Sequence, residues 1–274
     1  MEEHSIYEQI AARTGGSVYI GVVGPVRTGK STFVKRLMEQ LVLPNIEDPY
    51  RRERAQDELP QAASGRTIMT AEPKFVPEQA VEIQPDGKTT LSVRLIDTVG
   101  YLIPGAVGAD EDGKPRMVTT PWFPEEIPMT EAAELGTKKV MEEHSTIGIL
   151  VTTDGTITDI PRADYVDAER RAIADMRAAG KPFLVLVNSA QPSGEVAQEV
   201  CRQIHEEDGA ACMAVDCLTM DVDEISAVLT ALLYEFPVRE LQFYLPAWVS
   251  ALPADHPLKT ALYAALRERT ANVS

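Results

Sequence analysis

Eight consecutive residues near the start of the chain combine a glycine-rich turn with a lysine and a serine, the residue types that bind phosphate. They follow the pattern of a glycine, four further residues and then Gly-Lys-Ser. In such a turn backbone N–H groups surround the phosphates, the lysine neutralises the β- and γ-phosphates, and the serine hydroxyl ligates magnesium. We therefore predict a site for a nucleoside triphosphate and Mg²⁺. Its predicted binding residues are Gly24, Pro25, Val26, Arg27, Thr28, Gly29, Lys30, Ser31 and Thr32.

A second motif, Asp97-Thr98-Val99-Gly100, follows an apolar run that is typical of a buried strand. In phosphate-loop hydrolases an Asp-x-x-Gly segment at a strand end supplies a carboxylate on the metal side and a backbone N–H to the γ-phosphate. We assign these roles to Asp97 and Gly100. The catalytic residues predicted so far are thus Lys30, Asp97 and Gly100.

The segment between the two motifs offers hydroxyl groups on a long loop. One threonine there is expected to complete the magnesium coordination and to report whether the γ-phosphate is present. Thr70 is the first choice and Thr67 the second. The predicted metal ligands are then Ser31, Thr70 and Asp97, and Thr70 joins the catalytic set.

Two neighbouring residues bear on how water is activated. Tyr101 follows Gly100, at the place where signalling GTPases of this layout often carry a water-orienting glutamine. Water activation must therefore work differently here. Arg27, inside the phosphate loop, either adds positive charge in the transition state or is an exposed loop arginine.

The base-reading motif departs from the guanine-specific pattern. The segment Asn188-Ser189-Ala190-Gln191 stands where guanine-specific relatives show Asn-Lys-x-Asp. An aspartate there accepts hydrogen bonds from the guanine N1–H and 2-amino groups, and its loss weakens discrimination. We therefore predict that the site prefers adenine nucleotides or accepts both purines. Asn188 is predicted to contact the nucleotide on the side of its base. Asp154 is a second candidate for base contact, although its segment has the composition of a turn at a strand end.

These residues need a scaffold that aligns several strand ends, and the hydrophobic pattern predicts one. Strands are expected at 17–23, 91–96, 146–151, 183–187 and 211–215, alternating with helices at 31–41, 131–144, 164–179, 195–206 and 222–234. Residues 81–83 and 91–96 flank a turn and indicate a hairpin. The predicted fold is α/β: a P-loop NTPase of the GTPase-like type, with a mostly parallel doubly wound sheet and one antiparallel edge strand.

Two long polar segments and a distinct tail complete the organisation. Residues 45–77 are expected to form a functional loop that can reach the nucleotide, and residues 100–130 a second long segment rich in glycine and proline. Residues 1–236 form the predicted ATPase domain. Residues 237–274, interrupted by prolines, form a short C-terminal appendage with a final helix at 258–267.

The composition of the chain indicates which classes of binding partner are disfavoured. The chain has 274 residues, 44% of them hydrophobic, and a net charge of −16, which disfavours nucleic acid and anionic lipid as direct electrostatic partners. No apolar run approaches membrane-spanning length and the N-terminus lacks a signal sequence, so we expect a cytosolic protein without direct membrane insertion. Three cysteines are expected to be buried free thiols: Cys201, Cys212 and Cys217.

Longer strings of residues make the chain similar to a known family over essentially its whole length. It resembles the stage IV sporulation protein A family, morphogenetic ATPases that lie beneath the spore coat of endospore-forming bacteria. Besides the phosphate loop, the strings include Ala55-Gln56-Asp57-Glu58-Leu59-Pro60-Gln61, Thr67-Ile68-Met69-Thr70, Asp97-Thr98-Val99-Gly100-Tyr101 and Leu232-Leu233-Tyr234-Glu235-Phe236-Pro237.

The resemblance implies an ATPase derived from a GTPase fold, whose hydrolysis of ATP drives self-assembly into a basement layer on the forespore. It implies that Lys30 contacts phosphates, Asp97 serves Mg²⁺ and Thr70 is the sensor, with Ala71 where the family has a second threonine. It also implies a homopolymer, spore coat proteins as partners, and a small amphipathic membrane-anchoring peptide bound through domains that this chain lacks. The location implied is the mother-cell cytoplasm, at the forespore outer membrane.

Two other functions remain open from the residues alone. One is a reversible guanine-nucleotide switch that binds effector proteins, against which the missing Asn-Lys-x-Asp motif argues. The other is a structural protein that keeps its nucleotide unhydrolysed, which Tyr101 in the usual glutamine position suggests.

Overall fold

A six-stranded sheet forms the centre of the protein. The computed structural model of the chain describes residues 5–60, 72–104, 110–111, 114–120, 123–237 and 243–270, with the backbone alone at 110–111 and 123–124. The strand order is β10-β9-β8-β1-β3-β2, and only β2 runs antiparallel to its neighbour. The predicted α/β class, with a mostly parallel sheet and one antiparallel edge strand, is confirmed. The strands are β1 Ser17–Val23, β2 Lys74–Ile83, β3 Leu91–Asp97, β8 Ile147–Thr153, β9 Phe183–Asn188 and β10 Cys212–Val215.

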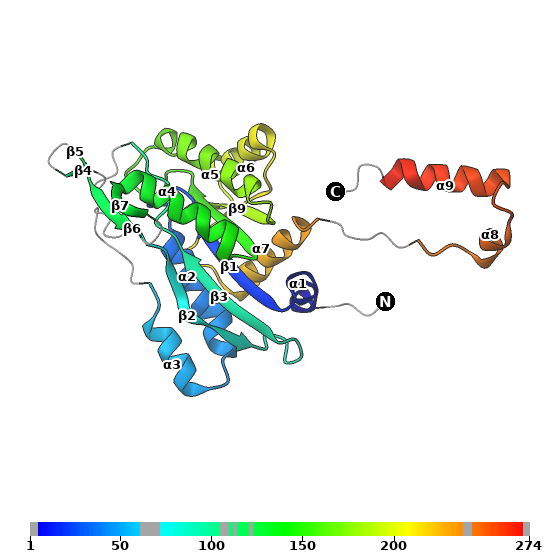
Figure 1. Cartoon of the computed structure of the whole chain (residues 1–274), viewed down its shortest axis with the longest axis horizontal. Helices are drawn as coiled ribbons and strands as arrows, with labels where there is room; N and C mark the ends of the chain where they lie inside the picture. Colours follow the sequence, from blue (N-terminus) through cyan, green and yellow to red (C-terminus); the bar gives the residue numbers. More distant parts are fainter. Residues whose placement is uncertain are drawn as a thin grey trace. The chain divides into compact units, whose positions relative to one another are not determined.

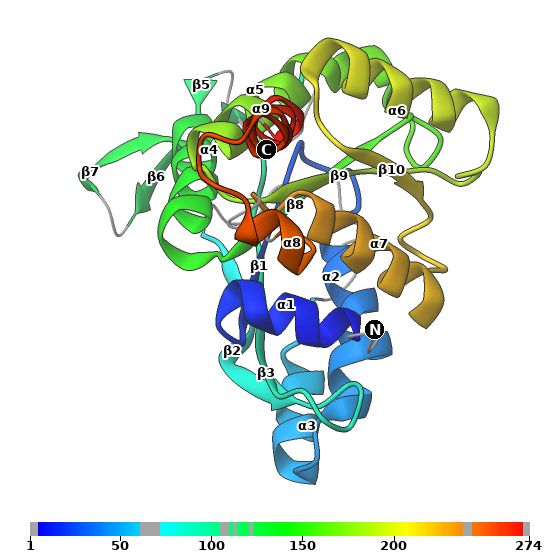
Figure 2. The ribbon, with the colours of Figure 1, turned by 90° about the vertical axis from the view of Figure 1, so that its right-hand side faces the viewer.

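Helices cover both faces of this sheet, as Figures 1 and 2 show. Helices α1, α2 and α7 lie on one side, and α4, α5 and α6 lie on the other. Because both faces are covered, the central strands are mainly apolar, and every residue of β8 is buried. The helices are α1 Ile6–Thr14, α2 Lys30–Leu37, α3 Pro49–Asp57, α4 Met129–Lys139, α5 Val166–Ala178, α6 Glu195–Asp208 and α7 Val222–Tyr234.

The register of the strands brings the motif-bearing ends together. Val22 of β1 pairs with Asp97 of β3, so the second motif starts beside the phosphate loop. On the other side of β1, Asn188 of β9 pairs with both Thr153 of β8 and Val215 of β10. All these residues lie at the carboxyl edge of the parallel strands, which is the edge where doubly wound sheets bind ligands.

The predicted loop over 45–77 is wrong in part. Residues Pro49–Asp57 form α3, whose N-terminus is capped by the Asp48 carboxylate and begins with Pro49. Only Ala55 of this helix is buried, so its sequence has no apolar period to reveal it. Strand β2 also begins at Lys74 rather than at residue 81. Pro77 is accommodated because β2 is an edge strand with an irregular register between Val76 and Val81.

The predicted loop over 100–130 also contains short strands. Strands β4 Asp110–Glu111 and β5 Lys114–Pro115 pair, as do β6 Met117–Thr120 and β7 Phe123–Pro128. Helix α1 was not predicted either, although Ser5 caps its start and Gly15 ends it. Helices α2 and α4 each continue into a π-helical turn, at Met38–Val42 and Val140–His144.

The three cysteines are free thiols near the late strands. Cys217 is buried, whereas Cys201 of α6 and Cys212 of β10 are half-buried. The Sγ atoms of the latter two lie 3.2 Å apart. Among the described residues, no helix combines the length and the apolar character needed to cross a bilayer.

The chain divides into two compact units, Met1–Glu235 and Phe236–Ser274. The second unit contains α8 Ala247–Ala251 and α9 Pro257–Thr270. Within it, the Lys259 ammonium donates to the backbone carbonyls of Ser250 and Leu252, at 3.3 and 2.9 Å, and so ties α9 to the end of α8.

Candidate nucleotide-binding site

The phosphate loop joins β1 to α2 and has the backbone geometry of a phosphate cradle. Arg27 and Gly29 adopt left-handed conformations, with φ of 66° and 94°. A side chain at Gly29 would collide with the amide of Asn188, so this position requires glycine. The buried hydroxyl of Thr28 donates to the carbonyl of Pro25 at 3.0 Å and closes the turn. Because α2 begins at Lys30, the N–H groups of its first turn have no partner within the helix and suit an anion.

Lys30 lies almost entirely inside this loop, with 6% of its surface exposed. Its ammonium donates to the carbonyls of Gly24 and Pro25, at 3.3 and 2.7 Å. Burial lowers the pKa of Lys30 to about 8, and the nearby Asp97 opposes this shift. A phosphate beside the ammonium would restore its usual preference for the charged form.

Ser31 and Asp97, two of the predicted magnesium ligands, lie in contact beside the phosphate loop. The Ser31 hydroxyl donates to Asp97 Oδ2 at 2.6 Å. The other carboxylate oxygen, Asp97 Oδ1, is buried and has no hydrogen-bond partner among the residues that the structure describes. Burial raises the pKa of Asp97, against the opposing effects of the Ser31 hydrogen bond and of Lys30. An unpartnered carboxylate oxygen beside a hydroxyl is the donor set that Mg²⁺ takes, so these residues fit the predicted ion.

Main-chain hydrogen bonds connect the segment after Asp97 to the phosphate loop. The Tyr101 N–H donates to the carbonyl of Gly24 at 3.1 Å, and the Val26 N–H donates to the carbonyl of Tyr101 at 2.9 Å. Gly100 has a φ of 96°, and a side chain there would collide with the Gly24 carbonyl and the Lys30 ammonium. The predicted γ-phosphate donor therefore lies directly beside Lys30.

Tyr101 is buried in the protein core. Its ring is 1% exposed, and its hydroxyl donates to Asp175 of α5 at 2.8 Å. Burial is the main cause that raises the pKa of this hydroxyl well above its usual range, and Asp175 adds to it. The side chain in the usual glutamine position is thus an anchor for α5, and how water is activated stays a prediction.

Asn188 connects the loop to the base side of the site. Its side-chain NH₂ donates to the Thr28 carbonyl, and its side-chain oxygen accepts from the Cys217 N–H, both at 3.0 Å. The predicted base contact is therefore also a brace between the phosphate loop and the segment after β10. Sequence reasoning did not single out that segment, and its signal is an aspartate, Asp216, directly after a strand.

Asp154 behaves as the strand-end turn that its sequence favoured. Its carboxylate accepts from the N–H and the hydroxyl of Thr156, at 2.9 and 2.6 Å. The loop that follows is held by a two-pronged ion pair between Arg162 and the buried Glu169 of α5, with N–O distances of 2.8 and 2.6 Å. This pair was also missed, because its members lie in an ordinary charged stretch of sequence.

The structure thus brings Lys30, Ser31, Asp97 and Gly100 together around the phosphate loop. Arg27 is exposed on the loop, and Asn188 lies on its other side. The two sensor candidates, Thr67 and Thr70, lie outside the described residues. Their predicted roles in metal binding and sensing stay predictions.

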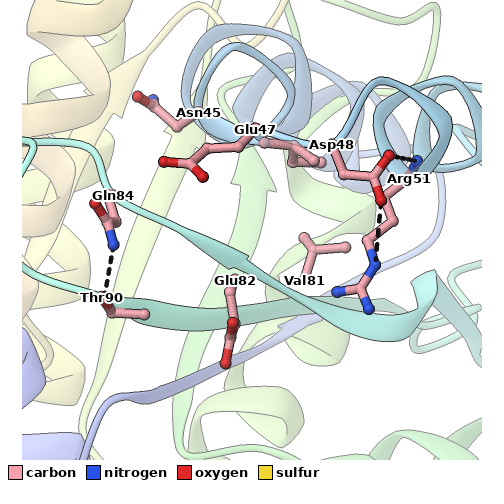
Figure 3. A pocket seen from close by; sticks show the side chains of 9 residues that line it. Asn45, Glu47, Asp48, Arg51, Val81, Glu82, Gln84 and Thr90 are labelled. Atoms are coloured by element: carbon pink, nitrogen blue, oxygen red, sulfur yellow. Dashed lines mark hydrogen bonds and ion pairs between the residues drawn. The ribbon is translucent and has the colours of Figure 1, made fainter.

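A separate cavity of about 190 Å³ lies between the start of α3 and the edge strand β2. Its lining includes three acidic residues, Glu47, Asp48 and Glu82, and Figure 3 shows Arg51 paired with Asp48. No residue of the predicted nucleotide site lines this cavity. A triphosphate that needs local positive charge is poorly suited to an acidic wall, so the phosphate loop remains the candidate site.

Comparisons with known proteins identify relatives. Residues 1–237 match the family model described as stage IV sporulation protein A, ATPase domain. The stage IV sporulation protein A of Bacillus anthracis is 48% identical over 273 residues, which are 100% of this chain and 56% of that protein. Its counterpart in Bacillus subtilis (strain 168) is 47% identical over the same shares. The protein of Clostridioides difficile (strain 630) is 45% identical over 265 residues, covering 97% of this chain and 54% of that protein. The chain spans about half the length of the curated relatives it matches.

Proposed function

The chain belongs to the stage IV sporulation protein A family through its ATPase domain, and from this we propose that it binds ATP with Mg²⁺ and hydrolyses it to ADP and phosphate. The observation that carries the proposal is the grouping of the Asp97 carboxylate, the Ser31 hydroxyl and the buried Lys30, in which the buried Asp97 Oδ1 has no partner within the described part of the chain. A carboxylate oxygen without a partner is unfavourable in the free protein, and a bound cation removes that cost.

Each residue of the phosphate end has a distinct task in this proposal. Lys30 and the loop N–H groups bind the β- and γ-phosphates, and the N–H of Gly100 donates to a γ-phosphate oxygen. Ser31, Asp97 and Thr70 would hold Mg²⁺, which neutralises the charge that develops on the phosphates. Thr70 also reports loss of the γ-phosphate. Since Tyr101 is buried against α5, its side chain takes no part in positioning water.

The larger function we propose is morphogenetic. Hydrolysis would rearrange the segments that flank the site and allow copies of the protein to assemble into the basement layer of the spore coat. The partners would be further copies, spore coat proteins and a small amphipathic membrane-anchoring peptide, the last bound through regions of the relatives that lie outside this chain. The assembly would sit in the mother-cell cytoplasm on the forespore outer membrane.

Competition binding and phosphate release test the enzymatic part. The 274-residue chain should bind ATP more tightly than GTP and release phosphate from ATP only when Mg²⁺ is present. Ser31→Ala should slow release by about tenfold or more because it removes a metal ligand. Ser226→Ala, on α7, is the matched control and should behave like the wild type. A chain that prefers GTP, or that binds ATP without ever releasing phosphate, contradicts the proposal and favours one of the two other functions.

Sedimentation tests the assembly part separately. Incubation with ATP and Mg²⁺ should yield material that pellets, whereas a non-hydrolysable ATP analogue should leave the protein in the supernatant. Complete hydrolysis without any pelleted protein would show that these 274 residues do not assemble by themselves.

A further inference from the structure

The direction in which a nucleotide lies across the site can be worked out from the sheet. Asp97 and Gly100 follow β3, on one side of β1, so the γ-phosphate end is there. The base must then extend past the other side of the phosphate loop, where β9 and β10 end. Asn188 marks this side because it hydrogen-bonds both the loop and the segment after β10.

The turn after β9 has little left to offer a base. The N–H of Ala190 donates to the Thr156 hydroxyl at 3.0 Å, and the N–H of Gln191 donates to the Ser189 hydroxyl at 3.0 Å. The segment Asn188-Ser189-Ala190-Gln191 carries no carboxylate. With these two N–H groups engaged and no carboxylate in the segment, we look to the neighbouring turn for the group that distinguishes one purine from another.

The turn after β10, residues 216–219, is built around a carboxylate. Asp216 Oδ1 accepts from the Leu218 N–H and Oδ2 accepts from the Thr219 hydroxyl, both at 2.9 Å. Arg36 of α2 donates to the Thr219 carbonyl at 3.4 Å. The adjacent Cys217 is fully buried, yet the Leu218 side chain is 71% exposed. An apolar side chain in this place offers a surface for the face of a ring.

We propose that this turn is the base subsite, and that Asp216 selects adenine by accepting a hydrogen bond from its 6-amino group while Leu218 packs against the ring. The proposal rests on the proposed ATPase function and names the group that reads its substrate. A carboxylate has about four lone-pair positions, and two of those of Asp216 are used within the turn. The remaining positions accept an amino group.

The same turn disfavours guanine. Guanine carries an oxygen at position 6, which needs a donor and is repelled by a carboxylate. The backbone donors of the turn are already engaged: the Cys217 N–H with Asn188, the Leu218 N–H with the Asp216 carboxylate, and the Thr219 N–H with the Asp216 carbonyl. Discrimination thus comes from an acceptor that suits adenine and from the removal of a donor that would suit guanine.

Dissociation constants for three purine nucleotides test this assignment. ATP, GTP and the triphosphate of purine riboside, which lacks any group at position 6, are measured by competition against a fluorescent ATP analogue. Asp216→Asn should weaken ATP by about fivefold to twentyfold without weakening GTP, so the preference for ATP over GTP falls by about tenfold. The preference for ATP over purine riboside triphosphate should fall by a similar factor.

Two further variants test whether the change in preference is caused by the Asp216 carboxylate. Asp216→Ser keeps an acceptor for the turn but removes the carboxylate, and it should lose the preference as well. Asp221→Asn removes the same charge five residues later, at the N-cap of α7, where asparagine caps as well as aspartate. It should keep the wild-type preference and control for net charge.

The outcomes separate the two proposals. Wild-type protein that binds no purine triphosphate, or that prefers GTP, overturns the proposed function and this inference with it. Wild-type protein that prefers ATP, with the same preference in correctly folded Asp216→Asn and Asp216→Ser, leaves the ATPase function standing and overturns the role of Asp216 alone.

Discussion

The two ends of the proposed nucleotide site are built in different ways. The phosphate end comes from one continuous loop and from a strand that pairs directly with the one before it, with Val22 opposite Asp97. The proposed base end comes from the segments after β9 and β10, which Asn188 links to the distant phosphate loop. Asn188 is 160 residues from its partner Thr28 and 29 residues from its partner Cys217.

This difference separates two kinds of chemistry. Every triphosphate presents the same charge and geometry, so one local motif of N–H groups, a lysine and a metal ligand serves any of them. Bases differ only at a few edge groups, and reading them requires donors and acceptors placed by the tertiary fold. Changes at the phosphate end should therefore abolish binding and hydrolysis of every nucleotide, whereas changes at the base end should alter preference.

Replacing the lysine of the phosphate end should have the largest effect. Lys30→Ala removes a buried cation, so the affinity for ATP and for GTP should both fall by about 100-fold or more. Calorimetric titration of each nucleotide measures this. Lys35→Ala, on the exposed face of the same helix, is the control and should bind normally. If Lys30→Ala weakened only one of the two nucleotides, the separation between phosphate and base ends would be wrong.

Asp97→Asn should uncouple activity from stability. Hydrolysis of ATP should fall by about 100-fold, because the amide is a poor ligand for Mg²⁺. The unfolding free energy should stay the same or rise by about 1 kcal/mol, since the substitution removes a buried carboxylate oxygen that no described residue bonds. Phosphate release across a Mg²⁺ titration, together with urea unfolding, gives both values. Asp57→Asn, at the exposed end of α3, controls for charge. A clear loss of stability in Asp97→Asn would show that the carboxylate is structural.

Asn188→Ala probes the link between the two ends. It leaves the Thr28 carbonyl and the Cys217 N–H without their partner, which should destabilise the protein by about 2 kcal/mol. The affinity for ATP should fall by roughly tenfold, because the phosphate loop and the turn after β10 lose their common support. Nucleotide titration at a temperature well below the unfolding midpoint separates the two effects. Unchanged affinity at that temperature would mean that the brace stabilises the fold without shaping the site.

The difference between local motifs and features set by the tertiary fold also explains which parts of the structure could be predicted from the sequence. Lys30, Ser31, Asp97 and Gly100 were assigned because each belongs to a short motif next to a strand, and strand alternation gave the fold class. Helix α3 was missed because its stability rests on a capping aspartate and an N-terminal proline rather than on an apolar face. Short runs of hydrogen bonds within a loop, such as β6 and β7, leave no periodicity to detect.

The base end shows where prediction from a single sequence stops. Asn188 was found because it occupies a motif position, but its role as a brace depends on the Thr28 carbonyl and the Cys217 N–H, which no residue type encodes. Tyr101 looked like a replaced catalytic residue. Only packing shows that it is an anchor for α5, because its partner Asp175 is 74 positions away.

The pH dependence of binding should give the smallest effect and belongs to the phosphate end alone. The free protein loses the Lys30 proton as the pH rises through about 8, below the usual lysine pKa, because burial disfavours the charge. A bound triphosphate favours the ammonium, so above pH 8 binding must take up a proton. The dissociation constant for ATP should therefore be flat below pH 7 and rise by about fourfold between pH 7 and 8.5. Titration calorimetry in buffers of different ionisation enthalpy measures the uptake directly, and GTP should show the same uptake because Lys30 does not contact the base. Proton release on binding would show that the titrating group is not Lys30. Proton uptake that differs between ATP and GTP would show that the base influences the phosphate end, so the two ends would not act independently.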